Sequence, residues 1–194
     1  EITYNGTVEE MDYMSRYSNH LCDIIKKGVN AEDYDHPLKG FKIVVDAGNG
    51  VGGFYADKVL KVLGADTEGS VYLDPDGMFP NHIPNPEDKT AMDSISKAVL
   101  DSKADLGVIF DTDVDRGGAV DSFGKEINRN RLVALASAIA LEGTDGGTIV
   151  TDSVTSSGLK DFIENHLGGK HYRYRRGYKN VIDKGIELNN NGEF

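Results

Sequence analysis

Cysteine and tryptophan are nearly absent from the 194-residue sequence, which has one cysteine, Cys22, and no tryptophan. A single cysteine excludes an internal disulfide, so we expect the protein in a reducing compartment, the cytoplasm. Cys22 lies within a helical pattern, where a small half-buried residue is a simpler interpretation than a catalytic thiol. No apolar run approaches the roughly 18 residues of a membrane-spanning helix, and the N-terminus lacks a signal-peptide pattern. We therefore expect no membrane partner.

Positive charge is also scarce. The sequence has 21 lysines and arginines against 32 aspartates and glutamates, which gives a net charge of −11. A chain this acidic has no general attraction for nucleic acid, so we expect no nucleic-acid partner. The one basic cluster, HYRYRRGYK at residues 171–179, is therefore informative. Apolar residues make up 39% of the sequence, which is enough for buried cores.

Only five prolines occur, and four of them fall within residues 74–86, DPDGMFPNHIPNP. A segment this rich in proline cannot form regular structure. Connections of this length without secondary structure are more often functional than filler. We therefore expect residues 74–86 to form a functional loop.

Apolar residues three and four positions apart predict an N-terminal helix over residues 8–28 that ends at Gly28. Its expected buried face consists of Met11, Met14, Tyr17, Leu21, Ile24 and Ile25. The rest of the chain alternates between runs typical of strands and runs of helical periodicity. Strands are expected at residues 41–47, 66–74, 104–110, 119–127 (two short strands), 147–152 and 170–176, and helices at 54–64, 87–103, 128–143, 156–169 and from 178 onward.

The strand–helix–strand rhythm occurs twice, and it predicts an α/β fold of two tandem small domains, each a mixed β-sheet with helices packed on it. We expect a helical tail from a preceding domain, with its linker, at residues 1–36. The two α/β domains are expected at residues 37–127 and 128–194, the latter truncated at its C-terminus. The start without methionine and the polar end NNNGEF predict an internal fragment of a longer protein.

The segment DTDVDRGG places Asp111, Asp113 and Asp115 directly after an expected strand and closes with Arg116. Three carboxylates this close repel by about 4 kcal/mol per pair at an effective dielectric of 20. On an extended segment their side chains point the same way, as ligands of a hard cation such as Mg²⁺ should. Arg116 adds a donor fork suited to a phosphate beside the metal. A solvated acidic turn is the simpler alternative.

An EF-hand calcium loop also begins D-x-D-x-D. That loop needs glycine at its sixth position and glutamate at its twelfth, where this sequence has Arg116 and Ser122. It also lies between two helices, whereas this segment follows a strand. The sequence therefore excludes an EF-hand.

The segment VVDAGNGVGG places Gly48, Gly50 and Gly53 between an expected strand and an expected helix, with Asp74 about twenty residues further on. One interpretation is a dinucleotide-binding loop, which would make the chain part of an oxidoreductase. The other is a tight turn that lets the strand and helix pack closely.

Arg173, Arg175, Arg176 and Lys179 surround Gly177 where a strand meets a helix N-terminus, a place suited to a phosphate. The alternative is a solvated basic edge strand. The histidines show no metal-ligand spacing, and His82 in PNHIPNP is interpreted as a turn residue.

Taken in order, the segments DAGNGVGG, FPNHIPNPE, DTDVDR and GYKNVI resemble those of the α-D-phosphohexomutase superfamily, the phosphoglucomutases and phosphomannomutases. The resemblance runs from about residue 38 to the end of the chain. It implies a four-domain enzyme of which this chain is the second domain and most of the third. The cofactor implied is Mg²⁺, held by Asp111, Asp113 and Asp115 together with an active-site phosphoserine.

The resemblance also implies a hexose phosphate substrate and hexose 1,6-bisphosphate as the intermediate of the full-length enzyme. Arg116 and Lys179 would be its catalytic residues in this chain. The family's serine loop, its sugar-selecting loop and its fourth domain have no counterpart in the sequence. We therefore expect the first and fourth domains as missing partners, an inactive isolated chain, and no indication of which hexose is preferred.

Overall fold

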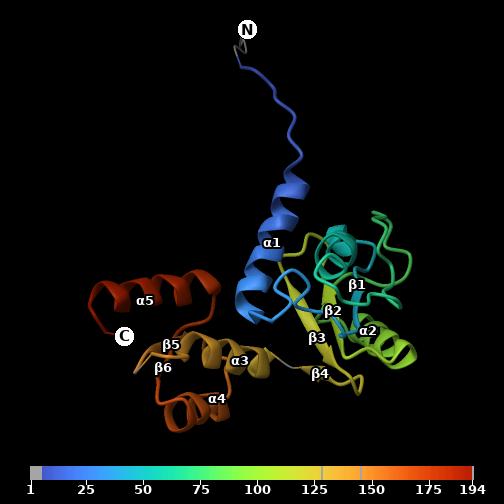
Figure 1. Cartoon of the computed structure of the whole chain (residues 1–194). Helices are drawn as coiled ribbons and strands as arrows, with labels where there is room; N and C mark the ends of the chain where they lie inside the picture. Colours follow the sequence, from blue (N-terminus) through green and yellow to red (C-terminus); the bar gives the residue numbers. More distant parts are fainter. Residues whose placement is uncertain (1–5, 128, 145, 194) are drawn as a thin grey trace. The chain divides into compact units, whose positions relative to one another are not determined.

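The computed structural model describes residues 6–127, 129–144 and 146–193. Its contacts divide the chain into two compact units, Glu1–Glu126 and Ile127–Phe194 (Figure 1). Within the described residues, no helix combines the length and the apolar character needed to cross a bilayer.

The first unit is built on a mixed sheet, as predicted, and its four strands have the order β1-β2-β3-β4. Strand β1 (Ile43–Asp46) is parallel to β2 (Leu106–Phe110), and β2 is antiparallel to β3 (Gly117–Asp121). Strand β4 (Glu126–Ile127) lies at the edge. The pairing of β1 with β2 brings segments 63 residues apart in sequence to one end of the sheet, because both strands run in the same direction.

Helical segments cover both faces of this sheet. On one face, Val44 and Ile109 pack against Ile95 of helix α2 (Lys89–Ser102). On the other face, Val45 packs in a second cluster with residues of the sheet, of the helical segment η2 (Ala56–Leu60) and of the turn that follows it: Ile43, Ala56, Leu60, Ala65 and Phe110. Successive residues of β1 therefore enter different cores, which is why this strand is apolar at consecutive positions.

Helix α2 begins later than the sequence pattern indicates. Glu87 and Asp88 were expected in its first turn, but the helix starts at Lys89. The Asp88 carboxylate is the N-cap and accepts hydrogen bonds from the backbone N–H groups of Thr90 and Ala91. An aspartate just before the first turn satisfies amides that have no partner within the helix.

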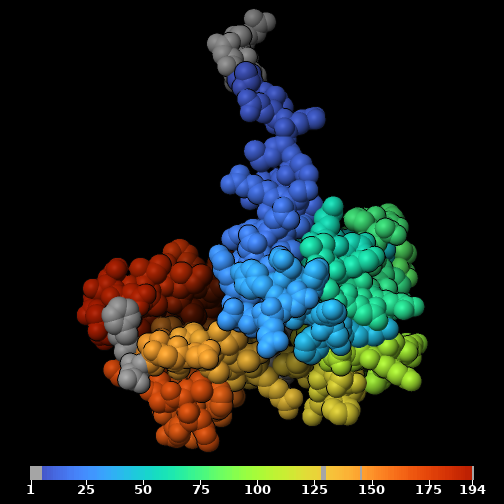
Figure 2. Space-filling view, viewed as in Figure 1, coloured from blue at the N-terminus to red at the C-terminus, as the bar shows by residue number. Residues whose placement is uncertain are grey.

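Helix α1 (Tyr13–Val29) corrects two expectations. Its buried residues are Ser18 and Cys22. Of the predicted face, Leu21 and Ile25 pack against the cluster around Cys22, whereas Met14 and Ile24 are at least 39% exposed. The first turns of α1 extend away from the rest of the unit (Figure 2), so only its later turns have a partner to pack on. The helix also passes Gly28 and ends at Val29, followed by the cap residue Asn30 in a left-handed conformation.

The predicted strand at residues 66–74 does not form. Only two isolated parallel bridges remain, Lys42 with Asp66 and Asp46 with Val71. The backbone turns at Gly69 (φ 101°) and again at Tyr72 (φ 53°), so the segment cannot continue along the edge of β1.

The second unit has a sheet of two parallel strands, β5 (Thr148–Thr151) and β6 (Lys170–Arg173). Its helical elements are α3 (Arg129–Leu141), α4 (Ser157–Asp161), η3 (Phe162–His166) and α5 (Tyr178–Asn190). Ser156 caps α4 by accepting a hydrogen bond from the Leu159 N–H. Leu141, Leu159 and Ile163 form the buried core.

Candidate metal centre

Three loops meet at the carboxyl ends of β1 and β2. We call them the glycine loop (residues 47–50), the proline loop (residues 75–86) and the aspartate loop (residues 111–116). The glycine loop follows β1 and the aspartate loop follows β2. In α/β sheets this end of the strands is where ligands usually bind.

The aspartate loop connects β2 to β3 as a hairpin. The backbone N–H of Asp111 donates to the carbonyl oxygen of Arg116 at 3.1 Å, which closes the loop. Between them the chain reverses, with Val114 at φ 67°, a conformation that is costly for a β-branched residue. One oxygen each of Asp111, Asp113 and Asp115 lies within 4.8 Å of the other two. The carboxylates thus converge because the loop turns, and the predicted extended segment is wrong.

Arg116 lies beside these carboxylates. Its Nε donates to Asp111 Oδ2 at 2.9 Å, and its backbone N–H donates to Asp111 Oδ1 at 3.0 Å. The guanidinium also lies 3.5 Å from Asp115 and donates from Nη1 to Asn85 Oδ1 at 3.2 Å. The side chain is 54% exposed, so it can still reach a ligand above the loop.

The three carboxylates differ in their electrostatics. Burial disfavours the charge on Asp111, but hydrogen bonds from the Arg116 backbone, Asp115 and the Arg116 guanidinium outweigh it and lower the Asp111 pKa. The pKa of Asp115 is raised, first by its hydrogen bond with Asp111 and then by the charges of Asp113 and Asp111. The loop therefore carries more negative charge than its own arginine offsets.

This donor set fits a hard divalent cation. Three carboxylates and one guanidinium leave a net charge of −3 + 1 = −2, which one divalent cation would balance. Two oxygens bound to the same Mg²⁺ lie at most about 4.2 Å apart, twice the metal–oxygen distance. The observed spread of 4.8 Å therefore requires only small side-chain adjustments. Asp113 and Asp115 are exposed, so their side chains have room to make them.

The glycine loop contacts the aspartate loop directly. A Cβ on Gly50 would lie 2.8 Å from the carbonyl oxygen of Thr112. The same oxygen accepts a hydrogen bond at 3.0 Å from the N–H of Val51, which begins the helical segment η1 (Val51–Gly53) directly after the loop. A Cβ on Gly53 would overlap the carbonyl oxygen of Leu73. These glycines are therefore required by close backbone packing.

Gly48 and Asp74 also belong to the proposed dinucleotide-binding motif, and both contact other residues of this chain. Gly48 has φ 53° and lies against Pro84 of the proline loop. The Asn49 side chain donates to the carbonyl oxygen of Asp74 at 2.8 Å. Protein contacts thus account for the glycine spacing, and dinucleotide binding stays a prediction.

A buried polar cluster was missed by the sequence analysis. His82 lies in a bend, as interpreted, but it is buried: its side chain is 2% exposed, and its Nε2 lies 3.0 Å from Asp46 Oδ1. Ser94 Oγ donates to Asp46 Oδ2 at 2.6 Å. Asp46 is central, so this is not a nucleophile–histidine–acid arrangement. The sequence feature that could have indicated this cluster is Asp46, a charged residue at the end of the otherwise apolar strand β1.

The second unit holds the predicted basic residues. Lys179 lies in the first turn of α5, where its Nζ pairs with Asp183 at 2.6 Å. Arg175 stacks on the Tyr174 ring with 5.4 Å to its centroid. Among the residues described, no acidic side chain forms an ion pair with Arg173, Arg175 or Arg176. Their charges remain available to an anion.

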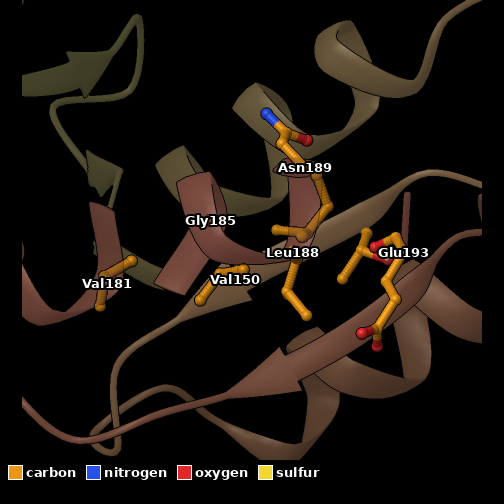
Figure 3. Close-up of a pocket in the computed structure, with 8 residues that line it drawn as sticks. Val150, Val181, Gly185, Leu188, Asn189 and Glu193 are labelled. Carbon is orange, nitrogen blue, oxygen red and sulfur yellow. Dashed lines mark hydrogen bonds between the residues drawn. The ribbon is translucent and has the colours of Figure 1, made fainter. Parts of the chain in front are cut away.

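A groove of about 320 Å³ separates β5 from α5 in this unit. Figure 3 shows Val150, Val181 and Leu188 along it, and Glu193 is its charged residue. It lacks a cationic group for a phosphate, so we do not assign a substrate site there.

Comparisons with known proteins point to one family. A family model described as phosphoglucomutase/phosphomannomutase, alpha/beta/alpha domain II, matches residues 15–124. A phosphoglucomutase of Neisseria meningitidis is 34% identical over 163 residues, which are 84% of this chain and 33% of that protein. A phosphomannomutase/phosphoglucomutase of Pseudomonas aeruginosa is 31% identical over 179 residues, which are 92% of this chain and 36% of that protein.

A solved structure is also similar. The crystal structure of a phosphoglucomutase/phosphomannomutase family protein from Burkholderia thailandensis has a TM-score of 0.74 and 29% identity, covering 95% of this chain and 37% of that one. The chain thus spans about a third of the length of these relatives.

Proposed function

Because the chain belongs to the phosphoglucomutase/phosphomannomutase family, we propose that it is the metal-binding part of an enzyme that interconverts hexose 1-phosphate and hexose 6-phosphate. The observation that carries the proposal is the convergence of Asp111, Asp113 and Asp115 within 4.8 Å, with Arg116 beside them.

In the proposed reaction, a phosphoserine outside this chain transfers its phosphoryl group to the sugar, which becomes a hexose 1,6-bisphosphate. The bisphosphate reorients and returns its other phosphoryl group to the serine. Phosphoryl transfer depends mainly on positioning and on charge neutralisation. Mg²⁺, when bound, would offset the negative charge of the transferring phosphoryl group.

The residues of this chain have separate roles in the proposal. Asp111, Asp113 and Asp115 hold the cation, and Asp111 is held in place by Arg116. The exposed part of the Arg116 guanidinium is free to contact the phosphoserine or the substrate. Lys179 and the neighbouring arginines of the second unit would hold a phosphate group of the substrate.

The test uses the full-length protein that contains this chain. We expect it to convert glucose or mannose 1-phosphate into the 6-phosphate when Mg²⁺ is present, and the isolated 194-residue chain not to do so. Asp113→Asn should abolish the conversion. The matched control is Asp93→Asn, which removes an exposed carboxylate from helix α2. An Asp113→Asn enzyme with full activity would refute the proposal.

A further inference from the structure

Asp46 is fully buried at the end of β1, yet its carboxylate is surrounded by donors from three segments. Gly48 N–H of the glycine loop donates to Oδ1 at 2.8 Å, and Ser94 Oγ of α2 donates to Oδ2 at 2.6 Å. His82 of the proline loop places its Nε2 3.0 Å from Oδ1 and 3.1 Å from Oδ2. A buried carboxylate is tolerated only when it is satisfied in this way. Asp46 therefore joins two loops and a helix.

The His82 ring is fixed from several sides. Its Nδ1 lies 3.0 Å from the carbonyl oxygen of Ile83, so both ring nitrogens face oxygen atoms of the protein. The Tyr72 ring packs on it edge to face with 5.5 Å between centroids. The first half of the PNHIPNP segment is thus anchored in the interior, although Asn81 and Ile83 on either side are exposed.

Three residues further on, the proline loop contacts the aspartate loop. Asn85 Oδ1 accepts a hydrogen bond from Arg116 Nη1 at 3.2 Å. Pro86 packs on β3, where a Cβ on Gly118 would lie 3.2 Å from its Cβ. The path from Asp46 through His82 and Asn85 therefore ends on the arginine that holds Asp111.

We infer that His82 and Asp46 are positioning residues for the aspartate loop: they fix the proline loop so that Asn85 orients the Arg116 guanidinium on Asp111. The inference rests on the proposed function, since it assumes that the aspartate loop binds a divalent cation. Without Asn85, the half-exposed Arg116 guanidinium is free to turn further toward Asp113 and Asp115, where it would compete with the cation for their carboxylates. Partners that orient a ligand from outside the coordination sphere affect metal affinity for the same reason.

The experiment measures two properties of the 194-residue chain. Mn²⁺ affinity is followed by electron paramagnetic resonance, and the Arg116 Nε–Hε resonance is followed by NMR without metal. We expect His82→Leu and Asn85→Ala each to weaken Mn²⁺ binding about fivefold, the effect of one hydrogen bond on an equilibrium constant. Both should shift or broaden the Arg116 resonance, and the double variant should add little, because the residues act in series. His82→Gln, which keeps one donor toward Asp46, should restore most of the affinity.

Val99→Ala is the control for a loss of stability alone. It truncates a buried side chain of α2 that lies in the core and away from the loops. It should lower the unfolding temperature but leave Mn²⁺ affinity and the Arg116 resonance unchanged. If His82→Leu behaves like Val99→Ala, His82 is merely structural and the inference is overturned.

Two further outcomes separate the inference from the proposed function. If Asp113→Asn binds Mn²⁺ as the parent chain does, the proposed function fails, while the Arg116 resonance still tests the positioning. If His82→Leu does not fold, Asn85→Ala decides, because it leaves the buried cluster intact. An unchanged Mn²⁺ affinity and an unchanged Arg116 resonance in Asn85→Ala overturn the inference.

Discussion

Arg116 engages both carboxylate oxygens of Asp111, with its backbone N–H 3.0 Å from Oδ1 and its Nε 2.9 Å from Oδ2. Asp111 is buried, whereas Asp113 is exposed and makes no hydrogen bond or ion pair within the described part of the chain. A cation would therefore bind to one fixed carboxylate, Asp111, and to exposed carboxylates that can adjust. Substitution of an exposed carboxylate should therefore affect cation binding more than the stability of the fold.

The first prediction concerns Asp113. We expect Asp113→Asn to weaken Mg²⁺ binding at least about tenfold, since even changes to outer partners of a metal site cost this much. The unfolding free energy should not fall, because the substitution removes repulsion from Asp115 and no contact. Calorimetric titration and urea unfolding measure the two effects. If Asp113→Asn lowered the free energy of unfolding as much as the free energy of Mg²⁺ binding, Asp113 would have a structural role instead of being available as a metal ligand.

The second prediction concerns protonation of the loop. The Asp115 pKa is raised above the ordinary 3.8, mainly by its hydrogen bond with Asp111 and then by the charge of Asp113. A proton on Asp115 competes with the cation, so affinity should fall with decreasing pH, and the fall should begin at a higher pH than for an ordinary aspartate. Carboxyl ¹³C NMR without metal should show Asp115 titrating above 3.8 and Asp111 below it.

Asp113→Asn tests the cause of this shift. Removing the neighbouring charge should move the Asp115 midpoint downward, because a like charge disfavours ionisation. A midpoint that stays in place would mean that Asp113 does not approach Asp115 in solution.

The third prediction concerns Gly53, which ends the helical segment η1 after the glycine loop. A Cβ at Gly53 would overlap the Leu73 carbonyl oxygen, so Gly53→Ala should destabilise the protein by about 3 kcal/mol. Gly28→Ala is the matched control, since Gly28 lies in helix α1 with open space around it. Alanine there should stabilise by about 0.5–1 kcal/mol. Urea unfolding of both variants without any ligand measures the difference. An unaffected Gly53→Ala protein would mean that packing does not explain this glycine.

The fourth prediction concerns His171 in the second unit. Its pKa is lowered from 6.5 by burial and, secondarily, by the charge of Arg173. The folded state therefore binds fewer protons than the unfolded state, so stability is complete above pH 6.5 and is lost as the pH falls through the lowered pKa. Hydrogen exchange of the β5 and β6 amides should quicken over this range, once corrected for the intrinsic exchange rate.

His171→Gln should remove most of this additional dependence on pH, since glutamine does not titrate. His166→Gln is the control, because the His166 side chain is 65% exposed. If both variants kept the same dependence of stability on pH, burial would not lower the pKa of His171.

Sequence patterns predicted most of the strands and helices, because apolar periodicity records which side of an element is covered. The patterns failed where the structure of a segment depended on contacts with residues distant in sequence or on a local backbone conformation. Only part of the predicted face of α1 is covered, Leu21 and Ile25, because the helix packs through its later turns, around Cys22. The strand at residues 66–74 was lost because Gly69 and Tyr72 adopt positive φ, which its alternating pattern does not reveal. Family resemblance, by contrast, depended on short segments that carry chemistry, and the comparisons confirmed it.

The chain's amino-acid order by itself determined the α/β class and the presence of three carboxylates and an arginine after a buried strand. Both are local properties, set by side-chain periodicity and by residues adjacent in sequence. Only the tertiary structure decided how the carboxylates converge, through a hairpin closed by Asp111 and Arg116. It alone brought His82 to Asp46, 36 residues away, because that contact depends on how the proline loop folds back over the sheet.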